Sequence, residues 1–352
     1  MSMAKSASAT DMIPLSPDEP PVHGGDLGGA RRLFPAAPEP FVDLSTGINP
    51  QAYPMPALPA EAFARLPEPA AFAALAAVAA EAYGAPSPAG VVAAPGTQIL
   101  LPLVAGLAPT PGRAAIVVPT YSEHARAAAL AGHDVFDITE PAAGADADLV
   151  VVTNPNNPDG RLRTPQELMR IAEHLREQDG LLVVDEAFMD VAPQAMSLAP
   201  HVGCGNIVVL RSFGKFFGLA GVRLGFALTA PPLAARLAAL LGPWAVSGPA
   251  LAVGAMALAD RAWIERTRLR LAEEAQRLDT MLAGTGLDPV GGTALFRLVR
   301  TNRAADLFNH LGRAGILIRV FPEKPDRARF GLPGDADAWL RLERALGAFA
   351  AA

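Results

Sequence analysis

Two short apolar runs, each followed at once by polar and ionisable residues, stand at the centre of this chain. Residues 181–184 are apolar and precede Asp185, and residues 207–210 are apolar and precede a segment that contains Lys215. Four apolar residues that stop abruptly at polar ones are typical of a strand buried on both faces of a parallel sheet. Ligands of open α/β sheets bind at the carboxyl ends of the strands, so we expect Asp185 and Lys215 to lie together at that edge.

A repeated succession of strand, polar loop and helix surrounds these two runs. The apolar pattern predicts further strands at 91–94, 114–118 and 148–153, and helices at 70–83, from Ile99 onwards and at 164–178. The last of these helices has a clear start, because Thr164 can cap it, Pro165 suits its first turn and Glu167 completes a capping box. This alternation favours an α/β fold with a mostly parallel sheet.

The C-terminal third has a different order of elements, which predicts a smaller α+β domain. Its pattern indicates a long amphipathic helix at 260–282, strands at 294–299, 316–320 and 327–333, and helices at 304–314 and 337–348. We therefore expect a large domain at residues 50–245 and a small one at 250–352, which the N-terminal segment 22–49 joins. Residues 1–21 are polar and rich in Ala, Ser and Pro, and we expect a disordered arm there.

Composition and charge narrow the class of protein. Residues 237–259 are uncharged and long enough to cross a membrane, but Gly242-Pro243 and Gly248-Pro249 divide them, so we expect two core helices around a loop. A net charge of −6 gives no electrostatic case for binding nucleic acid. The single cysteine, Cys204, excludes an internal disulfide and has no evident activating partner, so a structural thiol in a soluble cytoplasmic protein is expected.

The residues expected at the sheet edge have the chemistry that pyridoxal 5′-phosphate requires. A carboxylate such as Asp185 keeps the pyridine nitrogen protonated, and an amine such as Lys215 bonds to the cofactor aldehyde. Gly96-Thr97-Gln98 opens a predicted helix whose backbone N–H groups can bind a phosphate, although Gly-Thr is also a common helix cap. Arg223 offers that phosphate a charge. No metal site is predicted.

Two more polar residues follow predicted strands. Tyr121 follows the strand at 114–118 and can stack on a flat ring, but it can equally be an ordinary packing residue. Asn157 lies in Asn154-Pro155-Asn156-Asn157-Pro158, where two prolines predict a rigid, non-helical loop. An amide held in that loop can donate to an oxygen on an aromatic ligand.

Four motifs occur in the order and spacing of the fold-type-I pyridoxal phosphate enzymes, and the chain resembles that family over residues 22–345. The motifs are the Asn154 to Pro158 loop, Asp185-Glu186-Ala187-Phe188, Ser212-Phe213-Gly214-Lys215 and Gly221-Val222-Arg223-Leu224-Gly225. Within that family the chain is similar to the branch of histidinol-phosphate aminotransferases and threonine-phosphate decarboxylases. The resemblance implies pyridoxal 5′-phosphate as cofactor, a small phosphorylated amino acid as substrate and a homodimer.

The resemblance also implies a role for each matching residue. Lys215 bonds to the cofactor, Asp185 pairs with the ring nitrogen, and Asn157 donates to the ring hydroxyl oxygen. Tyr121 stacks on the ring, and the cofactor phosphate is held by Gly96, Thr97, Gln98, Ser212 and Arg223. Arg329 is the expected clamp for the substrate carboxylate, and the further candidates for substrate phosphate or carboxylate are Arg319, His23 and Asn49.

Three features of the resemblance favour the decarboxylases, which convert L-threonine O-3-phosphate to (R)-1-aminopropan-2-ol O-phosphate for cobalamin biosynthesis. The segments His23-Gly24-Gly25-Asp26 and Ile48-Asn49-Pro50 are similar to the N-terminal signature of that group. Phe188 and Leu66 stand where the aminotransferases usually carry tyrosines, although simple packing also explains Phe188. Ser247 departs from the asparagine that relatives often have.

Two other functions stay open on the sequence. One is an aminotransferase that acts on histidinol phosphate or a related amino acid. The other is a non-catalytic binding or regulatory module, which is disfavoured because Lys215, Asp185, Asn157 and Arg223 are all present.

Overall fold

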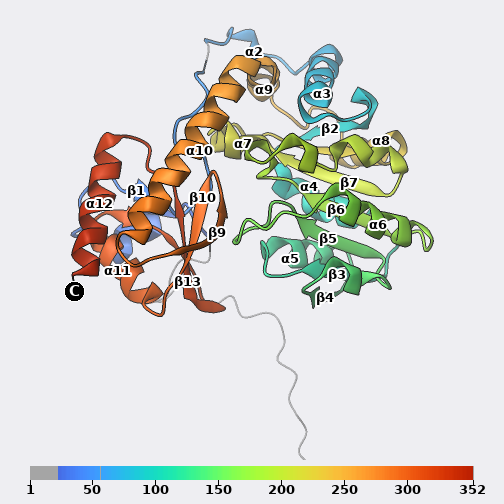
Figure 1. The fold of residues 1–352 in the computed structure, drawn as a ribbon. Helices are drawn as coiled ribbons and strands as arrows, with labels where there is room; N and C mark the ends of the chain where they lie inside the picture. The colour runs from blue at the N-terminus through green and yellow to red at the C-terminus, as the bar shows by residue number, and fades with distance from the viewer. Residues whose placement is uncertain (1–22, 56, 352) are drawn as a thin grey trace, which may run out of the picture.

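The computed structural model describes residues 23–55 and 57–351, so the arm expected at residues 1–21 lies outside the described residues. Figure 1 displays a large sheet with helices on both of its faces and a smaller group of elements formed by the C-terminal part of the chain. The long helix α10 (Arg261–Ala283) runs from the top of the large group down to the small one.

The large sheet contains seven strands within the described residues, in the order β2-β8-β7-β6-β5-β3-β4. Their bounds are β2 (Val91–Ala94), β3 (Arg113–Val117), β4 (Asp134–Ile138), β5 (Leu149–Thr153), β6 (Leu181–Asp185), β7 (Ile207–Ser212) and β8 (Gly225–Thr229). The pairs from β7 through β6, β5 and β3 to β4 are parallel, whereas β8 is antiparallel to both β7 and β2. The expected α/β fold with a mostly parallel sheet is confirmed.

The central strands are buried along their whole length, as the apolar runs predict. Every residue of β5, β6 and β8 is buried, because helices cover both faces of the sheet. The sequence pattern missed β4 and β8. Strand β4 lies at the sheet edge, where Asp134 and Asp137 are exposed, so it lacks a continuous apolar run.

The helices around this sheet are α3 (Pro69–Tyr83), α4 (Thr97–Ala105), α5 (Glu123–Leu130), α6 (Pro165–Arg176), α8 (Pro231–Leu241) and α9 (Gly248–Ala259). Helix α6 has the predicted capping box between Thr164 and Glu167. Helix α4 begins at Thr97, two residues before the predicted start. The uncharged stretch 237–259 consists of the end of α8, a loop and α9, as expected. Among the helices that the structure describes, none combines the length and apolarity that crossing a bilayer requires.

The small group is built on an antiparallel sheet in the order β12-β13-β10-β9, with α11 (Ala304–Arg313) and α12 (Ala336–Ala350) beside it. Its strands are β9 (Pro289–Thr293), β10 (Phe296–Arg300), β12 (Arg319–Phe321) and β13 (Lys324–Gly331). The single strand predicted at 316–320 is wrong. Ile318 separates β11 (Ile316–Leu317), which pairs with β1, from β12, which pairs with β13.

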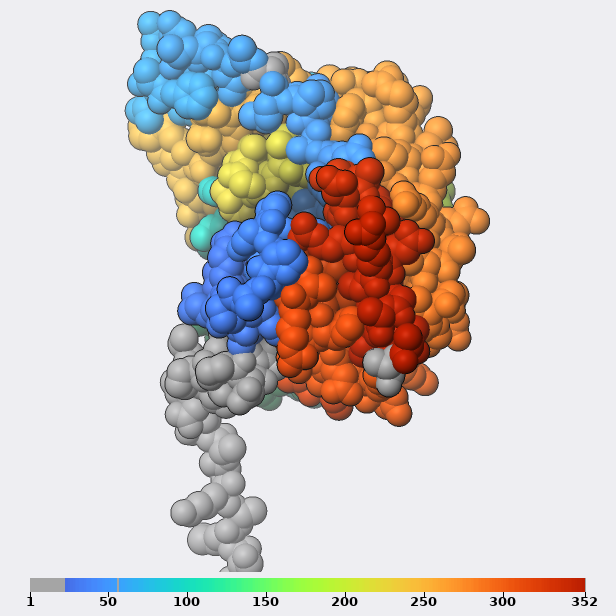
Figure 2. Space-filling view, turned by 90° about the vertical axis from the view of Figure 1, so that its left-hand side faces the viewer, coloured from blue at the N-terminus to red at the C-terminus, as the bar shows by residue number. Residues whose placement is uncertain are grey.

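The N-terminal segment packs on this small group. It contains α1 (Leu27–Leu33) and β1 (Val42–Asp43), and β1 pairs in parallel with β11. Figure 2 shows this segment, in dark blue, lying along the orange and red C-terminal elements. Farther along, the backbone N–H of Gly331 donates to the carbonyl of Leu44 at 2.7 Å. The chain then passes α2 (Glu61–Ala64) before it enters the large group.

Candidate active site

Asp185 ends strand β6 and has both carboxylate oxygens engaged. Its side chain is buried, with Oδ1 accepting from the backbone N–H of Ala187 at 3.0 Å and Oδ2 lying 3.0 Å from Nε2 of His124. A carboxylate held through both of its oxygens keeps one orientation. It can therefore stabilise a positive charge placed beside it, such as a protonated pyridine nitrogen.

His124 is a site residue that the sequence analysis did not single out. It lies in the first turn of α5 and is buried, and its Nε2 is also 3.4 Å from the hydroxyl of Thr153 at the end of β5. The usable signal was its spacing, because it follows Tyr121 by three residues and lies at the same sheet edge as Asp185. Histidines of that kind are often ordinary core residues, so spacing alone was a weak indication.

Lys215 lies in the short helix α7 (Phe213–Phe216), which directly follows β7. Burial and the guanidinium groups of Arg329 and Arg223 lower the pKa of its ammonium to about 8, while the Asp185 carboxylate opposes that shift. A lysine with such a pKa is in part a neutral amine near pH 8, which is the nucleophilic form. The structure thus brings together the charges of four predicted site residues: Lys215, Asp185, Arg223 and Arg329.

Arg329 on β13 joins the small group to the loop after β5. Its Nη1 donates to Oδ1 of Asn157 at 2.5 Å, and its Nη2 donates to the carbonyl oxygen of Ser45 at 2.7 Å. Because Oδ1 of Asn157 accepts from a guanidinium, its Nδ2 is the atom available to donate to a ligand. The Nε atom of Arg329 has no partner within the described residues, so this buried cation has capacity for an anion.

Arg319 is the cross-strand neighbour of Arg329. The register of β12 with β13 places the two residues directly opposite each other. Burial, together with the Arg319 cation, lowers the pKa of Arg329 to about 10, and burial also lowers the pKa of Arg319. Like charges opposite each other are unfavourable in a sheet, and an anion bound beside both guanidinium groups would reduce their repulsion.

The start of α4 has the features of a phosphate site. Gly96 precedes the helix with φ +84°, and no side chain caps the helix, so its first N–H groups are available to an anion. A Cβ at Gly96 would lie 2.6 Å from Nη2 of Arg223, so any other residue there would displace that guanidinium. Ser212 at the end of β7 is paired with Gly225 of β8. A Cβ added at Gly225 would lie 2.6 Å from the backbone nitrogen of Thr97, so β8 passes close to the start of α4.

Tyr121 lies beside the start of α4. Its hydroxyl donates to Oε1 of Gln98 at 3.1 Å, and Nε2 of Gln98 donates to Glu123 at 2.8 Å. The exposed His23 lies 3.9 Å from Glu123 and edge-on to the ring of Tyr121, with 6.1 Å between the ring centres. Burial and the carboxylates of Glu123 and Asp185 raise the pKa of Tyr121, so its hydroxyl is neutral at physiological pH.

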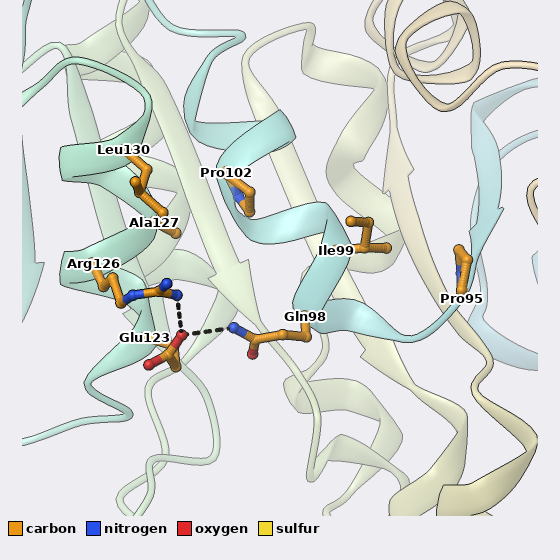
Figure 3. A pocket seen from close by; sticks show the side chains of 8 residues that line it. All are labelled: Pro95, Gln98, Ile99, Pro102, Glu123, Arg126, Ala127 and Leu130. Atoms are coloured by element: carbon orange, nitrogen blue, oxygen red, sulfur yellow. Dashed lines mark hydrogen bonds and ion pairs between the residues drawn. The ribbon is translucent and has the colours of Figure 1, made fainter. Parts of the chain in front are cut away.

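A surface cavity of about 300 Å³ adjoins this network between α4 and α5. Figure 3 shows Gln98 and Arg126 converging on Glu123 at its lower rim, while Ile99, Pro102 and Leu130 form apolar walls. Neither Asp185 nor Lys215 lines the cavity, so it borders the outer side of the candidate site.

Asn49 has internal partners for its side-chain atoms. Nδ2 donates to the carbonyl of Phe216 at 2.9 Å, while Oδ1 accepts from Gln51 N at 3.0 Å and from Nη2 of Arg270 at 2.9 Å. Its backbone N–H donates to the carbonyl of Lys215 at 2.9 Å. Through these contacts Asn49 links the segment of Lys215 and Phe216 to Arg270 of α10.

The other residues singled out by sequence have these surroundings. Phe188 is buried edge-on against Phe296, with 5.0 Å between the ring centres. Leu66 is 65% exposed. Ser247 caps α9, because its hydroxyl accepts from the backbone of Ala250 at 3.4 Å, and Cys204 is a partly exposed free thiol.

Comparison with known proteins places the sequence in one family. The sequence model described as aminotransferase class I and II matches residues 43–342. The chain belongs to this family. Two relatives named threonine-phosphate decarboxylase are similar over almost their whole length. The protein from a Sinorhizobium species is 45% identical over 334 residues, which cover 93% of this chain and 98% of the relative. That from Pseudomonas aeruginosa is 44% identical over 330 residues, covering 93% and 97%.

A solved structure shares the fold. The histidinol-phosphate aminotransferase of Sinorhizobium meliloti, solved in complex with pyridoxal 5′-phosphate, matches with a TM-score of 0.77 and 24% identity. The match covers 92% of this chain and 94% of that one. The fold-type-I class inferred from the sequence motifs is confirmed.

Proposed function

We propose that this protein is a pyridoxal 5′-phosphate-dependent decarboxylase that converts L-threonine O-3-phosphate to (R)-1-aminopropan-2-ol O-phosphate for cobalamin biosynthesis. The observation that carries the proposal is the similarity, at 44–45% identity over 93% of the chain, to two threonine-phosphate decarboxylases. The paired arginines of β12 and β13 support it, since the substrate has two anionic groups.

The residues present fit pyridoxal 5′-phosphate, which is the cofactor of this family. The uncapped start of α4 with Gly96, Thr97 and Gln98, together with Ser212 and Arg223, would hold the phosphate. Asp185 would hold the proton on the ring nitrogen, Asn157 would donate to the ring oxygen, and Tyr121 would pack on the ring. Lys215 is the amine that would bond to the aldehyde while no substrate is present. The bound cofactor supplies an electron sink for whichever bond to the substrate Cα lies perpendicular to its ring.

The arginines of the small group select that bond. Arg329 binds the substrate carboxylate, and Arg319 with His23 binds the phosphate, so the two anionic ends fix the orientation of Cα. The Cα–carboxyl bond then breaks, its electron pair stays on the Cα side, and carbon dioxide leaves. The Lys215 ammonium gives Cα the proton that replaces the carboxyl group. Asn49 positions the lysine segment and does not touch substrate.

Further features of the molecule accompany this function. The chain divides into a large domain at residues 50–245 and a small domain at 250–352 with the segment 22–49. Two chains form a homodimer, which the exposed Phe63, Leu66 and Leu130 support. The location is the cytoplasm, in keeping with the unpaired Cys204.

One assay separates decarboxylation from transamination. The protein loaded with pyridoxal 5′-phosphate is incubated with L-threonine O-3-phosphate in the absence of any 2-oxoacid, and carbon dioxide is measured. Sustained release of carbon dioxide supports the proposal. Turnover of histidinol phosphate that depends on a 2-oxoacid, without carbon dioxide from threonine phosphate, identifies an aminotransferase instead.

A further inference from the structure

A buried cluster of charges lies behind the candidate site, on the other face of the large sheet. Successive side chains of a strand point to opposite faces. Asp185 and Ser212 serve the site, whereas their chain neighbours Glu186 and Arg211 meet each other on the far side. Nη1 of Arg211 lies 3.1 Å from Oε2 of Glu186, and its Nη2 lies 2.7 Å from Oδ1 of Asp190.

This cluster is almost completely removed from solvent. Glu186 is 0% exposed, Arg211 4% and Asp190 5%. Glu186 also accepts from the hydroxyl of Ser197 and from the backbone of Leu198, each at 2.6 Å. Burial opposes the charge on Arg211, but Asp190 and Glu186 outweigh it and raise the pKa of its guanidinium. One cation is thus shared by two carboxylates.

Stability alone does not account for such a cluster. The cost of desolvating buried ions often exceeds their attraction, so replacing buried ion pairs by apolar residues of similar volume is frequently neutral or stabilising. What an ion cluster supplies that an apolar core does not is fixed geometry: here both Nη atoms of Arg211 have defined carboxylate partners, while its Nε and Oδ2 of Asp190 have none within the described residues. The geometry fixed here is that of the ends of β6 and β7, which carry Asp185 and lead into Lys215.

The cluster also reaches the helix that joins the two groups of elements. Nε of Arg268 on α10 donates to the carbonyl oxygen of Asp190 at 2.7 Å. The guanidinium of Arg268 lies 5.9 Å from the ring centre of Phe216, which directly follows Lys215 in the chain. Arg268 therefore contacts both the charge cluster and the lysine helix.

We propose that Arg211 is a positioning residue that sets the separation between Asp185 and Lys215 by binding Glu186 and Asp190 behind the sheet. This inference rests on the proposed cofactor roles of Asp185 and Lys215, but it applies equally to decarboxylation and transamination. Arg211 does not touch substrate or cofactor. Its guanidinium binds two carboxylates at once, which a lysine ammonium cannot do with the same planar geometry.

The test compares Arg211→Lys with the combined variant Arg211→Met/Glu186→Gln/Asp190→Asn, which removes all three charges and leaves no unpaired ion. The affinity of each apoprotein for pyridoxal 5′-phosphate is measured, along with the pH midpoint of the visible absorbance of the bound cofactor and kcat. Misplacing a catalytic group by about 1 Å can cost about 100-fold in rate. We therefore expect both variants to lose about 100-fold in kcat, to bind the cofactor more weakly and to shift the absorbance midpoint.

The matched control is Arg297→Met, which breaks an ion pair with Asp279 at 2.6 Å in the small group. We expect it to keep the wild-type cofactor affinity and absorbance midpoint. The inference is overturned if the folded combined variant has both wild-type values, whatever its melting temperature. Because these two readouts need no turnover, they stand even if the wild type fails to release carbon dioxide, an outcome that would overturn only the proposed reaction.

Discussion

Arg329 donates from Nη1 to Oδ1 of Asn157 across 2.5 Å, and this bond links a residue of the small group to the loop after β5. The proposed clamp for the substrate carboxylate is thereby in direct contact with the proposed donor to the cofactor ring. Binding of the substrate carboxylate by Arg329 and donation to the cofactor ring by Asn157 are therefore coupled through the side-chain amide of Asn157.

The Asn157→Asp variant tests this coupling. A carboxylate at this position accepts from Arg329 but cannot donate to the ring oxygen, and it competes with the substrate carboxylate for the guanidinium. A hydrogen bond to a charged group contributes about 1.5–3 kcal/mol, so we expect KM for threonine phosphate to rise about 10- to 100-fold. Steady-state kinetics measure this. The control is Asn302→Asp on the exposed surface, and an unchanged KM in Asn157→Asp would refute the coupling.

His124 is expected to hold Asp185 in its productive orientation, because its Nε2 lies 3.0 Å from Oδ2 of that carboxylate. We predict that His124→Phe lowers kcat by about 10- to 100-fold, the usual cost of removing a partner that orients a functional ligand. The pH midpoint of the cofactor absorbance should shift in the same variant. His174→Phe, at an exposed position on α6, serves as the control. A normal kcat in His124→Phe would contradict this role.

The low pKa of Lys215 predicts a pH dependence in the apoprotein. Only the neutral amine reacts with an acylating reagent, so acylation of Lys215 should rise with pH through a midpoint of about 8. Arg329→Gln removes a repelling cation and should raise the midpoint, whereas Asp185→Asn removes an attracting anion and should lower it. Peptide mass spectrometry measures the modification, with exposed Lys324 as an internal reference. A midpoint near 10.5 in all three proteins would refute the assignment.

Asn49 is expected to act on structure rather than on substrate. Its buried amide is bonded to Phe216 and Arg270, so Asn49→Ala leaves polar groups without partners and should lower the free energy of unfolding by about 1–3 kcal/mol. Urea denaturation measures this, with Asn309→Ala on the exposed face of α11 as control. An unchanged stability combined with a large rise in KM would instead make Asn49 a substrate ligand.

The sequence was sufficient for the parts of the site that follow directly from strand ends. Asp185 and Lys215 could be placed because apolar runs deliver them to one edge, and the glycine at position 96 indicated the start of α4. His124 and Arg211 could not be placed, since no local pattern tells whether their side chains turn toward a carboxylate on another strand. The division at Ile318 was hidden for a similar reason, because an unbroken apolar run does not reveal that its two halves pair with different strands.

The most direct measurement follows the fate of substrate atoms in heavy water. The wild-type protein with bound pyridoxal 5′-phosphate is given L-threonine O-3-phosphate labelled with carbon-13 in its carboxyl group, without any 2-oxoacid, and the products are examined by NMR and mass spectrometry. We predict that all of the label leaves as carbon dioxide and that the aminopropanol phosphate carries one deuterium at the former Cα. Label retained in a 2-oxoacid, with no amine product, would contradict the account.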